Sequence, residues 1–492
     1  MGAGIPAPAR PPEVDHRAAE LLTAAMTYAD GRWDERAGLM WGSAAGPERQ
    51  HDVRGTAAYA YGLLLRDQPG DRARALRAVD VILGQQIRDP GQPWDGTFFR
   101  TPEEPAPTQF SHRWENYDPN WRQFIGTALA LCLIDFGDRL PPSLEARIDD
   151  ALRRAVEGEL HEARLTPAYT NIAVMHAFLW TFAGERLHRP DWVAKGEAWA
   201  QAVHAGFQEH GTFEEYNSPT YYGVDLYGLA LWRRHGPTDV MRRLGADLEG
   251  ALWRDIAAFY HAGLRNMAGP YDRAYGMDMC RYVTGTGVLL RMVLDAGVAP
   301  LPDLRQPSEH DTDLMFAPLV IGLGVQIPAD AMAHFQHFQG ERTVSRTISS
   351  QRVATAWLGT QVMIGGEATS LSRGAGPASR TIFHPATIHW RTPDGGIGWI
   401  DLHDCPRVDA RAAKDSLTVK AIGDSTFRLS APGLTPAAIT RDRWDLAGLT
   451  VRVETDAASI EVTPVAGAID VCYRAATKFV LGTSVPQGEP RH

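Results

Sequence analysis

The stretch Val344-Ser-Arg-Thr-Ile348 decides the fold, because the hydrophobic period of the chain changes there. From about Arg342 onward apolar residues alternate with polar ones, which is the period of a strand with one buried face. Before this point apolar residues recur at i, i+3, i+4 and i+7, which is the period of an amphipathic helix. The sequence therefore predicts a helical part followed by a β part.

Helical periodicity dominates the first two-thirds of the chain, and short loops rich in Pro and Gly separate the periodic stretches. No strand is predicted before about residue 340. Helices at this density predict an α/α toroid, in which alternate helices form an inner ring. The predicted helices are Ala18–Tyr28, Thr56–Leu65, Ala73–Gln86, Trp121–Phe136, Leu144–Val156, Asn171–Phe182, Trp192–Phe207, Tyr222–Trp232, Leu244–Tyr260 and Val283–Leu294.

Alternating stretches fill the last third, with turn signals such as Pro393-Asp-Gly-Gly396 between them. They predict an antiparallel β-sandwich of about ten strands. We therefore expect a multidomain α and β protein, with an α/α-toroid domain at 1–310, a linker at 311–340 and an antiparallel β-sandwich at 341–492. The clearest predicted strands are Val344–Ile348, Val362–Ile364, Ile388–Trp390, Leu417–Val419, Leu449–Val453 and Ile460–Val462.

Composition and charge exclude several classes of protein. Hydrophobic residues make up 44% and charged residues 22%, which excludes disordered and collagen-like chains. A net charge of −10 argues against a nucleic-acid partner, which requires a basic surface. The longest apolar run, Thr127–Ile134, is much shorter than the roughly 18 residues of a membrane span, so no membrane partner is expected.

Cysteine usage and the N-terminal segment bear on cofactors and location. The 4 cysteines are far apart and have no zinc-type spacing, so we expect neither a disulfide framework nor a metal or other cofactor. The segment Met1–Pro12 lacks the apolar core of a secretory signal, which favours the cytoplasm, or secretion if a leader has been removed. The oligomeric state stays open, and a homodimer is compatible with the sequence.

The densest group of polar and aromatic residues is Gly211-Thr-Phe-Glu-Glu-Tyr-Asn-Ser-Pro-Thr-Tyr-Tyr-Gly-Val-Asp225. Gly211 and Pro219 make it a loop that leads into a helix near Tyr222, which Ser218 can cap. Loops at the helix ends of a toroid are where side chains from several hairpins converge. The alternative is an aromatic turn that only packs one hairpin on the next. Its candidate residues are Glu214, Glu215, Asn217, Tyr221 and Tyr222.

Four smaller groups add further candidates. Trp114-Glu-Asn-Tyr-Asp-Pro-Asn-Trp-Arg122 combines tryptophan with polar groups, as sugar sites do, although a helix cap with core tryptophans is an equal alternative. Gly269-Pro-Tyr-Asp-Arg-Ala-Tyr-Gly-Met-Asp278 presents an arginine and two tyrosines on a loop. The third group is Tyr169-Thr-Asn171 at the start of a predicted helix, and the fourth is the pair His384 and His389 in the β part. The candidates are Asn116, Asp118, Trp121, Arg122, Asn171, Tyr271, Arg273, Tyr275, His384 and His389.

These motifs, in this architecture, resemble the polysaccharide lyases and heparinase-like enzymes built from an α/α toroid and an antiparallel β domain, such as the chondroitin AC, hyaluronate and oligoalginate lyases and the heparinase II/III group. The stretch Gly211–Gly223 resembles their catalytic tyrosine loop, with Tyr222-Gly223 at the Tyr-Gly of the motif. Asn171, 51 residues before Tyr222, is similar in position to their asparagine, and Gly269–Arg273 to their arginine-bearing loop.

The resemblance implies a lyase that cleaves a uronic-acid-containing oligo- or polysaccharide by β-elimination, without a metal. Tyr222 would be the base, the acid or both. Asn171 would donate to the uronate carboxylate, Arg273 or Arg122 would supply positive charge, and His384 or His389 would complete the site. Which of Tyr221, Tyr222 and Tyr275 is the base stays open. The other candidate residues would bind substrate.

Two other functions fit the same residues. A glycoside hydrolase on an α/α barrel would use a carboxylate pair, for example Glu215 with Asp118 or Asp272. A non-catalytic carbohydrate-binding protein would explain the tryptophans and the sandwich. It explains less well why so many ionisable groups gather in a few loops.

Overall fold

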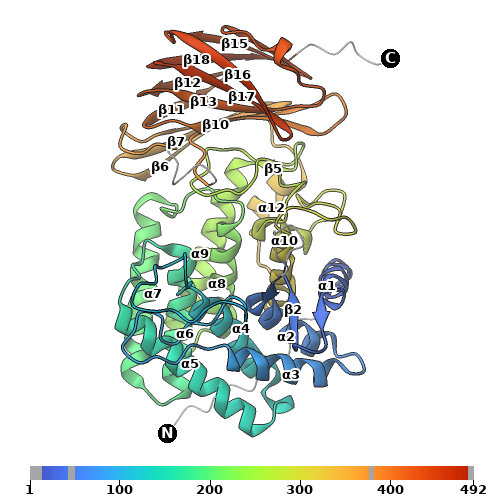
Figure 1. Cartoon of the computed structure of the whole chain (residues 1–492), viewed down its shortest axis with the longest axis vertical. Helices are drawn as coiled ribbons and strands as arrows, with labels where there is room; N and C mark the ends of the chain where they lie inside the picture. Colours follow the sequence, from blue (N-terminus) through green and yellow to red (C-terminus); the bar gives the residue numbers. More distant parts are fainter. Residues whose placement is uncertain (1–13, 43–49, 376–381, 486–492) are drawn as a thin grey trace. The chain divides into compact units, whose positions relative to one another are not determined.

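The computed structural model of the chain describes residues 14–42, 50–375 and 382–485, and these form two compact units (Figure 1). The first, which we call the helical unit, comprises Met1–Gly206, Gly223–Gly250 and Tyr282–Gln326. The second, the β unit, comprises Phe207–Tyr222, Ala251–Arg281 and Ile327–His492. Two segments from the helical part of the sequence therefore belong with the sheet.

Five of the described helices form a closed ring at the centre of the helical unit: α2 (Val53–Arg66), α4 (Trp121–Phe136), α6 (Thr170–Arg186), α8 (Tyr221–His235) and α11 (Phe316–Leu323). Along the ring α2 packs on α4 and α4 on α6, and α11 packs back on α2. In α8, the Trp232 indole donates to the Val174 carbonyl of α6 at 2.7 Å, and the Tyr227 ring lies 5.7 Å from that of Phe316. The α/α toroid predicted from the helical periodicity is confirmed.

Outer helices cover this ring: α1 (His16–Asp30), α3 (Asp71–Gly84), α5 (Pro142–Glu162), α7 (Pro190–His210) and α9 (Asp239–Phe259). Helix α3 packs on α2, and α5 packs on both α4 and α6. Helices α7 and α9 are joined by an ion pair from His204 to Asp247, 2.7 Å long. The short α10 (Gly285–Arg291) packs on α11.

Burial separates the inner from the outer helices. Helix α4 is buried around almost its whole circumference, and its sequence is apolar on all sides over Ile125–Leu133. The outer helix α5 buries only a stripe that includes Leu144, Ile148, Ala151 and Leu152. A helix that is apolar all round must have neighbours on every side, so the inner position of α4 follows from its composition.

Thirteen described strands form one antiparallel sheet in the β unit. Eleven of them follow the order β14-β15-β18-β12-β11-β8-β9-β10-β13-β17-β16. The other two form a branch, in which β6 pairs with β7 and β7 pairs with β8. The strands are β6 (Arg342–Ser349), β7 (Arg352–Leu358), β8 (Val362–Ala368), β9 (Ala386–Arg391), β10 (Ile397–Asp404), β11 (Val408–Ala413), β12 (Ser416–Ala421), β13 (Ser425–Ser430), β14 (Arg443–Leu446), β15 (Leu449–Thr455), β16 (Ser459–Val465), β17 (Ala468–Arg474) and β18 (Lys478–Ser484).

The sheet curls on itself, so that its two halves enclose a common core. Phe427 of β13 lies 5.6 Å from Trp444 of β14 and 5.2 Å from Phe479 of β18, although these strands are far apart in the sheet order. The alternating strands place their apolar residues on this inner face, as in β13, where every second residue is buried. The predicted two-layered antiparallel fold is confirmed, and one continuous curled sheet forms its layers.

Two expectations from the sequence differ from the structure. Short strands occur before residue 340: β1 (Trp33–Asp34), β2 (Leu39–Trp41), β3 (His51–Asp52), β4 (Tyr260–His261) and β5 (Asn266–Met267). Strands of two or three residues are too short to show a period in the sequence. The segment 311–340, predicted to be a linker, contains a 3-10 turn (Asp311–Met315), α11 and α12 (Ala329–Gln336). Proline and glycine in this segment concealed α11, which completes the ring.

Candidate active site

Two loops of the β unit bring most of the predicted site residues together. The first leads into α8 and the second follows β5, and the side chains of two residues of the first loop hold the second. The Asn217 amide donates to the carbonyls of Ala268 and Pro270 at 2.7 and 2.8 Å. The Ser218 hydroxyl donates to the Arg273 carbonyl and also accepts the Tyr221 N–H at 3.1 Å, as predicted for a cap of this helix. Asn217 therefore has a structural role in holding the loops.

Glu215, Tyr221, Arg273 and Tyr275 form a connected group at these loops, which we call the tyrosine–arginine cluster. The Arg273 guanidinium pairs with Glu215 Oε1 at 2.5 Å and donates to the Tyr221 hydroxyl at 2.8 Å. It also stacks on the Tyr221 ring, with Cζ 3.7 Å from the ring centroid. The Tyr221 hydroxyl contacts the Tyr275 hydroxyl, and Tyr275 is 37% exposed. A chain of polar contacts thus runs from a buried carboxylate to an accessible phenol.

Two opposing effects act on the Tyr221 phenol. Burial raises its pKa well above the ordinary value of 10, and the neighbouring Arg273 charge acts in the other direction. A phenolate formed here would accept hydrogen bonds from both Arg273 and Tyr275. The cluster can therefore hold a proton at neutral pH and can stabilise the anion formed when that proton leaves.

Tyr222, predicted to be the catalytic base, lies in a different environment. It is 1% exposed, and its hydroxyl donates to Asp255 Oδ2 at 3.2 Å and contacts Thr212 Oγ1 at 3.0 Å. Asp255 pairs with Arg346 of β6 at 2.7 Å. Burial raises the pKa of Asp255, and the Arg346 charge opposes that rise. This geometry gives Tyr222 a structural role, in which its hydroxyl joins the first turn of α8 to Asp255 of α9.

Asp272 pairs with two arginines of the β unit. It pairs with Arg352 at 2.6 Å and contacts Arg373, and Arg352 also pairs with the fully buried Glu367 at 2.7 Å. Glu214 is exposed, and its carbonyl accepts from Arg352 at 3.1 Å. The two loops are thus fixed to the sheet by charge pairs that sequence analysis missed. Arg352 lies in β7 and Arg373 in the connection that follows β8, and nothing in their sequence context indicates their distant partners.

The remaining predicted residues of the β unit are deeply buried. The Tyr271 hydroxyl donates to the Met267 carbonyl at 2.5 Å. His384 lies between two protein acceptors, Asp401 and the Ala274 carbonyl, at 2.9 and 3.1 Å. His389 is fully buried, and burial lowers its pKa to about 4, so it is neutral at pH 7. None of these three rings projects into solvent.

Five predicted residues belong to the helical unit. Asn171 is buried in the first turn of α6, and Asn116 and Asp118 accept backbone N–H groups of their own loop at 2.8 and 2.9 Å. Burial raises the pKa of Asp118. Trp121 is almost fully buried at the start of α4. The role of Asn171 as a partner of the substrate carboxylate stays a prediction.

Arg122, the fifth, is completely buried, and its donors reach structural acceptors. It pairs with Glu159 at 3.2 Å and Glu162 at 2.7 Å, and it donates to the carbonyls of Pro93 and Asp95. Arg122 is predicted from the sequence to bind substrate, whereas its position indicates that it holds α4, α5 and the preceding loop together. A substrate-binding arginine and a structural arginine look the same in the sequence when each lies beside a tryptophan.

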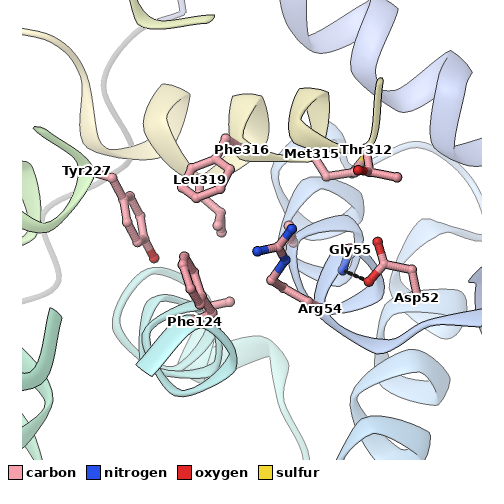
Figure 2. A pocket seen from close by; sticks show the side chains of 11 residues that line it. Asp52, Arg54, Gly55, Phe124, Tyr227, Thr312, Met315, Phe316 and Leu319 are labelled. Atoms are coloured by element: carbon pink, nitrogen blue, oxygen red, sulfur yellow. Dashed lines mark hydrogen bonds between the residues drawn. The ribbon is translucent and has the colours of Figure 1, made fainter. Parts of the chain in front are cut away.

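A pocket opens at the mouth of the helical ring (Figure 2). The first turns of α2, α4 and α11 and the Tyr227 ring of α8 line it, and Arg54 points into it. Arg54 lies over the Phe124 ring, with Cζ 5.1 Å from the ring centroid. Its Nη2 lies 3.7 Å from Asp313 Oδ1. With a volume of about 20 Å³, the cavity has room for water but not for a sugar ring.

The described residues include no group of three or more His, Cys, Asp or Glu side chains arranged to hold a metal ion. In the same part of the chain, no helix is long and apolar enough to cross a lipid bilayer.

Two family models match the chain. The domain of unknown function DUF8769 matches residues 19–324, which is more than half of the chain, and the domain of unknown function DUF8770 matches residues 336–472. The first match ends and the second begins inside the segment 311–340. No curated protein matches the sequence.

Several solved structures are similar to the chain at low identity. Heparinase III has 10% identity and a TM-score of 0.41, over 97% of this chain and 86% of its own. A point mutant of chondroitin AC lyase from Streptomyces coelicolor A3 has 13% identity and a TM-score of 0.42, over 100% and 81%. Endoglucanase CelQ from Clostridium thermocellum, in complex with cellobiose and cellotriose, has 10% identity and a TM-score of 0.32, over 96% and 93%. Similarity at this level transfers neither residues nor substrates to this chain.

Proposed function

We propose that this chain, which belongs to the family of the domain of unknown function DUF8769, is a carbohydrate-active enzyme that cleaves a uronic-acid-containing oligo- or polysaccharide by β-elimination. The observation that carries the proposal is the contact of Arg273 with the Tyr221 hydroxyl at 2.8 Å, next to the exposed Tyr275 hydroxyl. A phenol that meets solvent, with a fixed positive charge behind it, is the arrangement that a metal-independent elimination needs.

In this proposal the tyrosine pair, Tyr221 and Tyr275, acts as one acid–base group. When the pair loses one proton, the remaining proton is shared between the two oxygens, and Arg273 stabilises the negative charge. Tyr275 is the member that meets the substrate, because it is exposed. Glu215 holds the guanidinium in place through its ion pair. The assignment moves the base from Tyr222, whose hydroxyl faces Asp255, to its neighbour in sequence.

The reaction can be written with every proton assigned. The deprotonated pair takes the proton on C5 of the uronate, next to the carboxyl group. The C5–H electrons form the C4–C5 double bond as the C4–O bond breaks. The proton then passes from Tyr275 to the leaving oxygen, which restores the pair. The Arg273 charge also lowers the cost of bringing an anionic sugar to the cluster, although the net charge of the chain is −10.

The test is a product assay on purified protein. Uronate-containing oligosaccharides of defined sequence are incubated with the chain, and the ultraviolet absorbance of the new C4–C5 double bond is followed. A rise in absorbance together with shorter products supports the proposal. Because burial raises the pKa of Tyr221, we expect kcat/KM to increase with pH through the neutral range, as the deprotonated pair becomes more populated. Shorter products without the absorbance would overturn it.

A glycoside hydrolase is the second candidate, and one observation favours it. Burial raises the pKa of Asp118, as expected for the general acid of a hydrolase. Its proposed partners are less suitable, because Glu215 and Asp272 are each held by arginine. Hydrolysis gives reducing ends without ultraviolet absorbance. If cleavage of this kind occurs and Asp118→Asn abolishes it, the hydrolase replaces the lyase.

A further inference from the structure

The turn that carries Arg273 and Tyr275 is hydrogen-bonded to residues 382–384, which directly precede β9. Ala274, the residue between them, donates its N–H to the Ile382 carbonyl at 2.7 Å. Tyr271 and His384 exchange backbone hydrogen bonds of 3.0 and 2.9 Å. The Ser218 hydroxyl holds the Arg273 carbonyl from the first loop, and the next carbonyl, that of Ala274, is held by a side chain of the sheet side.

That side chain is the His384 imidazole. Its Nε2 lies 3.1 Å from the Ala274 carbonyl oxygen and its Nδ1 lies 2.9 Å from Asp401 Oδ2 of β10. Both partners are acceptors, whereas a neutral imidazole has a single N–H donor. Nδ1 makes no well-aligned hydrogen bond, so its contact with Asp401 is an ion pair. Only the imidazolium both donates to the Ala274 carbonyl and carries the positive charge that this carboxylate faces. Because the ring is 6% exposed, water offers no substitute for either partner.

The charged groups around His384 favour this state. Burial alone would lower the pKa of His384, but the Asp401 carboxylate raises it above the ordinary 6.5. Burial would likewise raise the pKa of Asp401, and His384 and His403 lower it to about 2. His403 Nδ1 lies 3.5 Å from Asp401 Oδ2, the same oxygen that faces His384. His389 is neutral, and Arg428 adds positive charge near Asp401.

We propose that His384 is a positioning residue, whose imidazolium ties the Ala274 carbonyl to Asp401 and thereby holds Arg273 and Tyr275 against Tyr221. This inference rests on the proposed function for its catalytic meaning, but its structural content is independent of it. It replaces the role of completing the catalytic site, which the resemblance implied for His384. A ring with both nitrogens engaged by the protein has no position left for a substrate proton.

The pH dependence of the turn has a definite sign. A group whose pKa is raised in the fold stabilises it fully below the pKa of the unfolded chain, and the effect is lost as pH rises through the folded value. We therefore expect residues 273–275 to be held tightly at acidic and neutral pH and to loosen at alkaline pH. The same loosening would lower activity above the pKa of His384, opposite to the rise expected from the tyrosine pair.

The first measurement is nitrogen NMR of the whole chain labelled at its histidine rings. We expect the two His384 nitrogens to have the similar shifts of an imidazolium at neutral pH. The second is amide hydrogen exchange of residues 271–275, as protection factors at several pH values. His384→Ala should raise exchange in this turn by about tenfold or more and remove its pH dependence, while the core strands keep their protection.

Two further variants separate the contacts. His384→Gln keeps a donor for the Ala274 carbonyl but has no charge for Asp401, so we expect partial protection that no longer varies with pH. His403→Gln is the matched control, because it touches Asp401 but not the turn, and it should leave exchange of residues 271–275 unchanged. A neutral His384 ring at pH 7, or unchanged protection in both His384 variants, would overturn the inference.

Activity gives a separate result. If the wild-type chain is a lyase, His384→Ala should lower kcat more than it raises KM, and His384→Gln should recover part of kcat and lose the alkaline decline. If the wild-type chain cleaves no uronate substrate by elimination, the proposed function fails. The exchange and NMR measurements still decide whether His384 holds the turn, so the two failures are distinguishable.

Discussion

Arg122 and Arg273 are both paired with glutamate, one in the helical unit and one in the β unit, yet their surroundings differ. Arg122 has no exposed side-chain surface, and its donors reach Glu159, Glu162 and backbone carbonyls. Arg273 is 21% exposed, and one of its donors reaches the Tyr221 hydroxyl. The first network ends in structural groups, whereas the second ends at a titratable phenol near the surface. The acceptors that a guanidinium binds, rather than the residue type, therefore separate a structural arginine from one with a chemical role.

The largest expected effect is on the tyrosine pair. Tyr275→Phe and Tyr221→Phe each remove a hydroxyl that the proposed proton transfer requires. We expect kcat/KM to fall by about 10² to 10⁴ in each variant, with little change in melting temperature, because Tyr275 is exposed and Tyr221 keeps its contact with the guanidinium. Steady-state kinetics of the elimination measure the loss. Full activity in both variants would remove the cluster from the mechanism.

The next effect tests the comparison of the two arginines directly. Arg122→Met removes the fully buried guanidinium from Glu159 and Glu162, which keep Arg164 at 3.0 and 3.5 Å, and it leaves the Pro93 and Asp95 carbonyls without that donor. We expect unfolding to become easier by about 3 kcal/mol. Arg273→Met should cost less, because the Arg273 side chain is 21% exposed and water can reach part of the site, but it should abolish most of the activity. Urea unfolding of both variants measures the difference. Equal stability losses would contradict the distinction between the two networks.

The third effect concerns the pKa of a buried carboxyl group of the helical unit that lacks such an ion pair with arginine, and the stability that depends on this pKa. The arginines around Glu159 lower its pKa against the effect of burial. Asp135 instead accepts from the Tyr61 hydroxyl at 2.6 Å, and burial raises its pKa from 3.8 to about 6. A raised carboxyl pKa means that stability is lost as pH rises from about 4 to about 6, by about 3 kcal/mol in this case.

Asp135→Asn should keep the hydrogen bond from Tyr61 and remove that loss. We expect the variant to be up to about 3 kcal/mol more stable than the wild type at neutral pH, and equal to it near pH 3. Thermal or urea unfolding at several pH values measures this. A variant that is less stable than the wild type at neutral pH would show that the charge on Asp135 has a favourable partner.

The smallest effect concerns Tyr222, the neighbour of Tyr221. Tyr222→Phe removes a buried hydrogen bond to Asp255 and leaves the tyrosine–arginine cluster intact. We expect a stability loss of about 1–2 kcal/mol and an activity within a few-fold of the wild type. This variant is the control for Tyr221→Phe, since the two differ by one position. A large loss of activity without a loss of stability would return the catalytic role to Tyr222.

Much of the fold could be predicted from periodicity. The run of apolar residues in α4 and the alternation at Val344–Ile348 identify an inner helix and a strand without any tertiary information. The short strands β1–β5 and helix α11 could not be found this way, because they are brief or contain proline and glycine. Their positions depend on packing against the ring and the sheet.

The site could be predicted only in part. The two loops were recognised, because polar and aromatic residues gather there with glycine and proline. Which hydroxyl meets Arg273 could not be deduced, since Tyr221 and Tyr222 are adjacent and point to different partners. The anchors Asp255, Arg352 and Asp401 were missed, because each acts on a loop far away in sequence.

By itself, the sequence determined a helical toroid, an antiparallel β part and the two loops where the chemistry is concentrated. Local periodicity and composition carry that information, because they record which face of each element is buried. The tertiary structure alone decided that Tyr221 meets Arg273, that Arg122 is a structural residue and that His384 is held between two acceptors. Those outcomes depend on burial and charge contributed by residues up to about a hundred positions away, and no local pattern contains them.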